Sequence, residues 1–208
     1  MKSNTMLIGF IGKKGSGKST AADYIKDNMN YVEKSFAECL KKACQNIFML
    51  SDQQINGDLK EVPDPRWNGC TPRKMFQFIG TDLFRNQLNN IIPGIQKDVY
   101  VRHFELWYLN VVKKNENAKI VVTDIRFQNE ADLIKKYDGT IIKIMKRDLE
   151  LDLHKSETEM DAIKDYDYVI DNDGLLYEFY KKVSDIVHKL EQDKFNIDQN
   201  ELFIDKMM

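Results

Sequence analysis

The chain has 208 residues, and 42% of them are hydrophobic, which is enough to bury the core of a soluble globular domain. Lysine and arginine (31) nearly balance aspartate and glutamate (33), so no general excess of positive charge points to nucleic acid or an anionic membrane as a partner. The three cysteines are odd in number and lack a paired CxxC spacing, which argues against a disulfide framework and a zinc site.

Four short apolar runs have the composition of buried β-strands. They comprise residues 6–11, 120–122, 140–145 and 168–170. Their apolar residues are mostly consecutive, which is typical of strands covered on both faces by helices. The first run is too short for a signal peptide core or a membrane span, so we expect a cytoplasmic protein without a membrane partner. The pattern predicts an α/β fold with three layers, in which helices flank a central, mainly parallel sheet.

Helical patterns occupy the middle of the chain. Thr71 and Pro72 form a helix start signal, and apolar residues then recur at helical intervals to residue 85, with a break expected near Gly80. A second helix is predicted over residues 99–114. Residues 52–69 contain two prolines and two glycines, which predicts a surface loop.

The carboxyl-terminal part of the chain predicts one long helix and a tail. Apolar residues recur at helical spacing over residues 174–191, so this helix should cover the sheet with its apolar stripe. We therefore expect one domain over residues 1–192, followed by a loosely attached polar tail over residues 193–208.

The strongest local motif is GKKGSGKS at residues 12–19, which fits G-x-x-x-x-G-K-[ST] between a predicted strand and a predicted helix. The glycines allow backbone N–H groups to point at phosphate oxygens, and the helix start adds partial positive charge. Lys18 is expected to reach the β- and γ-phosphates, and the Ser19 hydroxyl to ligate Mg²⁺. The residues predicted to bind the nucleotide phosphates are Gly12, Lys13, Lys14, Gly15, Ser16, Gly17, Lys18, Ser19 and Thr20.

A phosphate-binding loop (P-loop) leaves the reaction open, because switches, motors and kinases all use it. A guanine-binding switch is expected to carry Asn-Lys-x-Asp, and the chain has no such tetrapeptide. A kinase for a small acceptor needs cations that gather two anionic reactants and a lid that excludes water.

The stretch VVTDIR, residues 121–126, places an acid and a base directly after a predicted strand. Ligands of open parallel sheets bind beyond the carboxyl ends of the strands, so Asp124 and Arg126 should lie beside the P-loop. Asp124 is predicted to hold Mg²⁺ directly or through water, and Arg126 to contact a phosphate. The alternative is that Asp124 caps the helix predicted to begin near Phe127.

Five ordered stretches resemble motifs of the viral and bacteriophage deoxynucleoside monophosphate kinases. They are SFAECLK (35–41), TPRKMFQFIGTDLFR (71–85), VVTDIRFQNEAD (121–132), HKSE (154–157) and DYVIDNDG (167–174). With the P-loop, the resemblance spans the chain to about residue 190. It implies a P-loop kinase fold with a small lid, which uses ATP and Mg²⁺ to phosphorylate a deoxynucleoside monophosphate to the diphosphate. It also suggests a homodimer and, for a viral protein, the host cytoplasm.

The resemblance extends to the residues of the site. It implies that the acceptor-binding region covers about residues 36–90 and the lid about residues 147–160, where His154 is a candidate lid contact. The catalytic residues would be Lys18, Asp124, Arg126 and Arg147. The acceptor-binding residues would be Lys41, Arg73, Gln77, Asp82, Arg85, Asp124, Arg126, Gln128 and Glu130.

The residue types agree with this chemistry. A monophosphate has a second pKa near 6, so its attacking oxygen is largely anionic at neutral pH and needs no general base. Cations such as Lys18 and the arginines then matter more than a base, because they offset the repulsion between two anions. Two alternatives stay open: a kinase with a hydroxyl acceptor, in which Asp124 takes the proton, and a non-enzymatic nucleotide sensor.

Overall fold

Five parallel strands form the central sheet of the computed structural model, which describes residues 4–95, 97–147 and 159–207, without side chains from residue 198 onward. The order across the sheet is β2-β3-β1-β4-β5. The strands are β1 (Met6–Ile11), β2 (Val32–Lys34), β3 (Lys119–Val122), β4 (Thr140–Met145) and β5 (Tyr168–Asp171). β1 lies at the centre, between β3 and β4, so its carboxyl end is surrounded by those of its neighbours.

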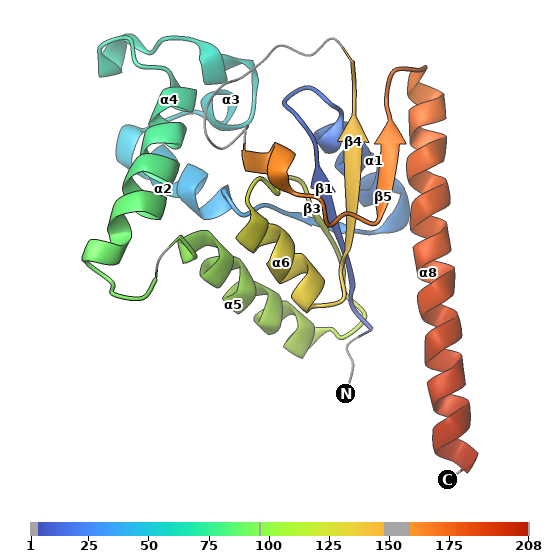
Figure 1. Ribbon diagram of the computed structural model, residues 1–208. Helices are drawn as coiled ribbons and strands as arrows, with labels where there is room; N and C mark the ends of the chain where they lie inside the picture. Colours follow the sequence, from blue (N-terminus) through green and yellow to red (C-terminus); the bar gives the residue numbers. More distant parts are fainter. Residues whose placement is uncertain (1–3, 96, 148–158, 208) are drawn as a thin grey trace.

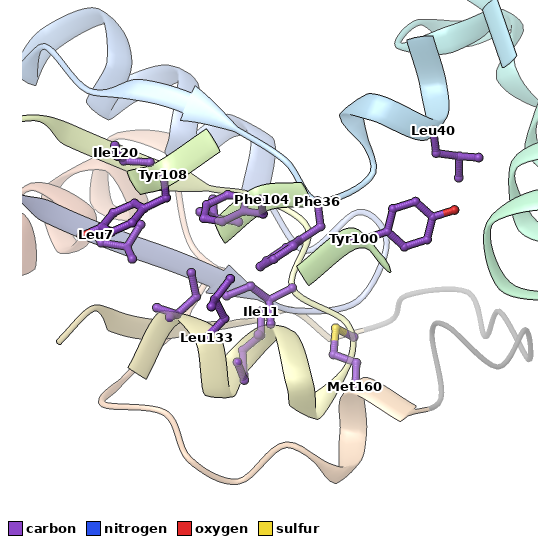
Figure 2. Packing of buried hydrophobic residues seen from close by; sticks show 14 of the residues in the cluster. Leu7, Ile11, Phe36, Leu40, Tyr100, Phe104, Tyr108, Ile120, Leu133 and Met160 are labelled. Carbon is purple, nitrogen blue, oxygen red and sulfur yellow. The ribbon is translucent and has the colours of Figure 1, made fainter. Parts of the chain in front are cut away.

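Helices cover both faces of this sheet (Figure 1). The helices α1 (Lys18–Met29) and α8 (Leu176–Met207) pack on one face, and α5 (Val99–Lys114) and α6 (Gln128–Lys136) on the other. Along β1, Ile8 and Phe10 face the first pair of helices, whereas Leu7 and Ile11 face the second. Both faces are therefore apolar, which explains the consecutive apolar residues of the strands. Figure 2 shows the hydrophobic cluster between the sheet and the second pair of helices, which includes Leu7, Ile11 and Phe104.

A group of mainly short helices follows β2 and, with α3 and α4, reaches the side of the molecule toward which the strands point (Figure 1). Its members are α2 (Glu38–Phe48), α3 (Asp52–Ile55), η1 (Asp58–Glu61), η2 (Pro65–Trp67), α4 (Pro72–Gln77), η3 (Phe78–Arg85) and η4 (Leu88–Asn90). A further short helix, η5 (Glu159–Ala162), precedes β5. This arrangement places the helical group where ligands of parallel sheets bind.

The structure confirms the predicted α/β class, the parallel sheet and all four predicted strands. The helix predicted over residues 99–114 is α5, with the same bounds. One helix and one loop differ from prediction. α8 continues through Met207 instead of ending near residue 191, and the predicted loop over residues 52–69 contains α3, η1 and η2. In the described part of the chain, no helix is long and apolar enough to cross a membrane.

The predicted break near Gly80 takes the form of a change in winding. The chain passes from the α-helix α4 into a π-helical segment, η3, at Phe78. A β-carbon at Gly80 would lie 2.5 Å from Cδ2 of Leu40, so glycine permits close packing of η3 on α2. π-helical turns often occur at functional sites, because they redirect side chains within a helix.

Candidate active site

The P-loop joins β1 to α1 and needs glycine at two positions. Gly17 has a φ of 107°, a conformation that residues with a side chain rarely adopt. A β-carbon at Gly12 would lie 2.4 Å from the backbone oxygen of Ile144. The loop therefore has the backbone shape that the motif predicts, with the start of α1 directly behind it.

The polar side chains of the P-loop differ in their hydrogen-bond partners. Nζ of Lys18 donates to the backbone oxygen of Gly12 and, at 2.8 Å, to that of Lys13. Ser19 is exposed at the start of α1. The hydroxyl of Ser16 is buried and, among the described residues, has no hydrogen-bond partner. Buried polar atoms are nearly always paired, so this hydroxyl of the P-loop is available to hydrogen-bond a ligand.

Asp124 binds the backbone that leads into α2. Its two carboxylate oxygens accept hydrogen bonds from the N–H groups of Phe36 (2.8 Å) and Ala37 (2.9 Å). The N–H groups that precede α6 are instead bound by Glu130, which accepts from Arg126 at 2.8 Å and Phe127 at 3.2 Å. The alternative that Asp124 caps α6 is therefore wrong, and its role as a Mg²⁺ ligand stays a prediction.

A pocket of about 170 Å³ opens beside Asp124, between α2, η1, α4, η3, α5 and the segment after β3. Seven of the predicted acceptor-binding residues line it: Lys41, Arg73, Gln77, Arg85, Asp124, Arg126 and Glu130. Two others do not, because Asp82 is exposed on η3 and Gln128 is exposed on α6, where it donates to Asp132. We call this cavity the acceptor pocket.

Lys60 also lines the acceptor pocket, and the sequence pattern did not indicate it. Burial, together with the neighbouring positive charges of Lys41, Arg73 and Arg126, lowers the pKa of Lys60 to about 8. These four cations therefore form one electropositive end of the pocket. Lys60 lies on η1, in the segment predicted as a surface loop, and no local pattern distinguishes it from a solvated lysine.

The wall of the pocket also contains a buried ion pair between Arg85 and Glu130, which are 5% and 2% exposed. The guanidinium of Arg85 also lies 3.7 Å from the ring centre of Phe127 and donates to the backbone oxygen of Lys97. Burial raises the pKa of Glu130 to about 7, although the charge of Arg85 and two backbone N–H donors act in the opposite direction. Because the guanidinium of Arg85 is already bound to Glu130 and Lys97, we interpret Arg85 as a structural part of the pocket wall and not as a phosphate ligand.

Glu61 connects the P-loop to the acceptor pocket. Its Oε1 accepts from Nζ of Lys14 at 2.6 Å and also from Nε of Arg73. Burial raises the pKa of Glu61, but hydrogen bonds from Lys14 and Arg73 outweigh it and hold that pKa below its usual range. One carboxylate oxygen thus joins a predicted ATP-binding residue to a predicted acceptor-binding residue.

Arg147 lies apart from the acceptor pocket. Its side chain is 81% exposed and its Nε lies 3.0 Å from Oδ2 of Asp173. Most of the predicted lid, including His154, lies outside the described residues. The described end of that segment, η5, contacts the P-loop, since the N–H of Gly12 donates to Sδ of Met160 at 3.3 Å.

Comparisons with known proteins point to one family. Residues 66–183 match the deoxynucleotide monophosphate kinase family. A protein of Acanthamoeba polyphaga mimivirus, provisionally described as a deoxynucleotide monophosphate kinase, is 50% identical over 190 residues, which cover 90% of this chain and 98% of that protein. The deoxynucleotide monophosphate kinase of Enterobacteria phage T4 is 29% identical over 147 residues, which cover 70% of this chain and 56% of that protein.

Solved structures show the same fold. A dephospho-CoA kinase from Campylobacter jejuni has a TM-score of 0.50 and 18% identity, and the match covers 91% of this chain and 98% of that one. A protein from Thermus thermophilus has a TM-score of 0.51 and 14% identity, with 89% and 98% of the two chains covered. At these identities the likeness concerns the fold alone.

Proposed function

The chain belongs to the deoxynucleotide monophosphate kinase family, and we propose that it transfers the γ-phosphate of ATP to a deoxynucleoside 5′-monophosphate held in the acceptor pocket. The product is the deoxynucleoside diphosphate. The P-loop binds the phosphates of ATP, and Lys18 stabilises the phosphate that is transferred. The family match does not favour a hydroxyl acceptor or a non-enzymatic sensor.

The observation that carries the assignment of the acceptor site is the electropositive end of the pocket. Lys41, Lys60, Arg73 and Arg126 meet there, although they come from four separate segments of the chain. Glu61 pairs with Arg73, and Asp124 also lines the pocket, so part of the mutual repulsion of the cations is offset, and a bound anion would offset more of it. A phosphate group supplies that anion, and four cations provide the charge to bind it.

The bridge through Glu61 supports a transfer between neighbouring sites. Lys14 and Arg73 share one carboxylate oxygen, so the P-loop and the electropositive end lie within one ion-pair cluster. Direct transfer requires the two substrates to meet in this way, because the reacting atoms must approach to about 3 Å.

The chemical step needs charge and position more than it needs a base. An oxygen of the acceptor phosphate forms a bond to the γ-phosphorus of ATP, while the bond to the bridging oxygen breaks and ADP leaves. The attacking oxygen is already anionic at neutral pH. Asp124 is held by the N–H groups of Phe36 and Ala37, which suits a role in positioning that backbone at the pocket.

We also propose that Mg²⁺ takes part, held by Ser19 and, directly or through water, by Asp124. Among the described residues, no group of three or more histidine, cysteine or acidic side chains is arranged so that it could hold a metal ion by itself. In kinase sites, Mg²⁺ takes most of its ligands from phosphates and water and only one or two from the protein, and Ser19 and Asp124 would supply these. When bound, Mg²⁺ neutralises charge on the β- and γ-phosphates.

Two further proposals concern the setting of the enzyme. We propose that it acts in the cytoplasm of a host cell, which the viral and phage relatives support. We also propose a homodimer, which light scattering of the purified protein tests directly.

A substrate panel tests the function. The purified chain is mixed with ATP, Mg²⁺ and each common deoxynucleoside or ribonucleoside monophosphate, and ADP release is recorded. We expect release with at least one deoxynucleoside monophosphate, and none with the corresponding nucleoside or with Lys18→Ala. Release with nucleosides but not with monophosphates would contradict the proposal.

A further inference from the structure

Two buried polar atoms lack a hydrogen-bond partner among the described residues, and both lie at predicted substrate sites. One is the hydroxyl of Ser16 in the P-loop, and the other is the hydroxyl of Tyr100. Tyr100 is 5% exposed and lines the acceptor pocket. Leaving a buried hydroxyl unpaired is unfavourable, so such an atom calls for an explanation.

The surroundings of Tyr100 leave space beside its hydroxyl. A β-carbon at Gly80 would lie 3.6 Å from that oxygen and 2.5 Å from Leu40. Because Gly80 has no side chain, this part of the pocket stays open between α2, η3 and α5. In Figure 2 the hydroxyl of Tyr100 points away from Phe36, toward the side on which Leu40 lies.

Tyr100 lies beside the Arg85–Glu130 pair of the pocket, since the guanidinium carbon of Arg85 lies 5.1 Å from the centre of its ring. The titratable groups that act on its hydroxyl are Cys39, Arg85, Cys44 and Glu130, whereas those that act on Lys60 are Lys41, Arg73, Glu61 and Arg126. Arg85 and Glu130 are already paired with each other and with neighbouring groups. Burial raises the pKa of Tyr100, so its hydroxyl stays protonated and can donate as well as accept.

We propose that the Tyr100 hydroxyl hydrogen-bonds a polar atom of the nucleoside part of the acceptor, and so helps to select the substrate. The inference rests on the proposed function. With its phosphate at the electropositive end, a deoxynucleoside monophosphate extends its sugar and base toward Tyr100. The atom is either the 3′-hydroxyl of the sugar or a polar edge of the base, both of which donate or accept hydrogen bonds.

The test is Tyr100→Phe, which removes only the hydroxyl. We expect kcat/KM for the deoxynucleoside monophosphate to fall about three- to tenfold, the value of one hydrogen bond, with the KM for ATP unchanged. The melting temperature should not fall, since the variant loses a buried hydroxyl that has no partner in the protein. A structural role would give the opposite result: a lower melting temperature and no selective effect on the acceptor.

Tyr108→Phe is the matched control on the same helix. Tyr108 is also buried, but its hydroxyl hydrogen-bonds Thr5 and it does not line the pocket. We expect this variant to lose thermal stability and to keep the wild-type kcat/KM for the acceptor.

A 2′,3′-dideoxynucleoside monophosphate distinguishes the two candidate atoms. If the partner is the 3′-hydroxyl, Tyr100→Phe and the wild type will use this substrate equally well. If the partner is the base, the penalty will persist and differ among bases. Equal kcat/KM of wild type and Tyr100→Phe on every deoxynucleoside monophosphate would overturn the inference while the proposed function stands. A wild type inactive on all monophosphates would instead refute the function.

Discussion

The residues predicted to bind the ATP phosphates are nine consecutive ones, 12–20, whereas the acceptor pocket takes its walls from segments spread between residues 36 and 130. In the first region, local backbone shape creates the binding site, and glycine and a helix start are sufficient. In the second, isolated cations become a site only when distant helices pack together. A motif therefore identifies the nucleotide site, while the chemistry of the acceptor depends on tertiary structure.

The largest expected effect is in the P-loop. Lys18→Ala should lower kcat by at least about a hundredfold, because it removes the lysine whose positive charge is proposed to stabilise the transferred phosphate. Turnover is measured by ADP release at saturating substrates, and the melting curve reports the fold. Lys26→Ala, a half-exposed position on the same helix whose side chain pairs with Asp23 and Glu33, is the control and should change kcat less than twofold. A folded Lys18→Ala with wild-type turnover would show that the loop is not the reacting site.

The next effect is in the acceptor pocket and should be selective for one substrate. Arg73→Ala should raise the KM for the deoxynucleoside monophosphate about ten- to a hundredfold, since hydrogen bonds to charged groups contribute about 1.5–3 kcal/mol. The KM for ATP should change little. Lys74→Ala, the exposed neighbour on α4 that does not line the pocket, should leave both constants unchanged. If Arg73→Ala raised the KM for ATP as much as the KM for the deoxynucleoside monophosphate, the proposal that the two substrates bind at separate sites would be contradicted.

A smaller effect should appear with pH. Lys60 has a pKa of about 8, so its positive charge is lost as the pH rises through that value. We expect kcat/KM for the acceptor to fall severalfold between about pH 7 and pH 9.5, because this constant reports the ionisation of the free enzyme.

Lys60→Arg sharpens this measurement, because a guanidinium stays charged over the whole range. Its profile should be flatter than that of the wild type at high pH. Identical profiles would mean that Lys60 does not contact the acceptor phosphate.

The smallest expected changes in the acceptor KM distinguish two residues of one helical segment, one inside the pocket and one outside it. Asp82→Ala should change the acceptor KM less than twofold, because Asp82 is exposed outside the pocket. Gln77→Ala, which removes a side chain that lines the pocket, should raise it severalfold. A larger effect at Asp82 would indicate that the substrate reaches beyond the acceptor pocket.

Local patterns were sufficient to predict most of the fold. The bounds of β1, β4 and α5 follow from continuous apolar runs or helical spacing, and the structure has the same bounds. β2 was missed, because Val32–Lys34 is a short edge strand with two charged residues and little burial. Its place in the sheet depends on pairing with β3, which is distant in the sequence.

The site was less predictable where it depends on long-range contacts. Asp124 was identified from its place after a strand, but its hydrogen bonds to Phe36 and Ala37 join residues nearly ninety positions apart. No local sequence pattern marks Lys60 or Tyr100 as a site residue, since their proposed roles depend on burial and on neighbours from other helices. The roles of Arg147 and of the lid stay predictions.

The most direct test of the account uses a compound in which adenosine and a deoxynucleoside are joined 5′ to 5′ through a chain of phosphates. If the P-loop and the acceptor pocket form one crevice, this compound should compete with both ATP and the deoxynucleoside monophosphate and bind more tightly than either. Lys18→Ala and Arg73→Ala should each weaken it. Competition with ATP alone, together with no effect of Arg73→Ala, would contradict the account.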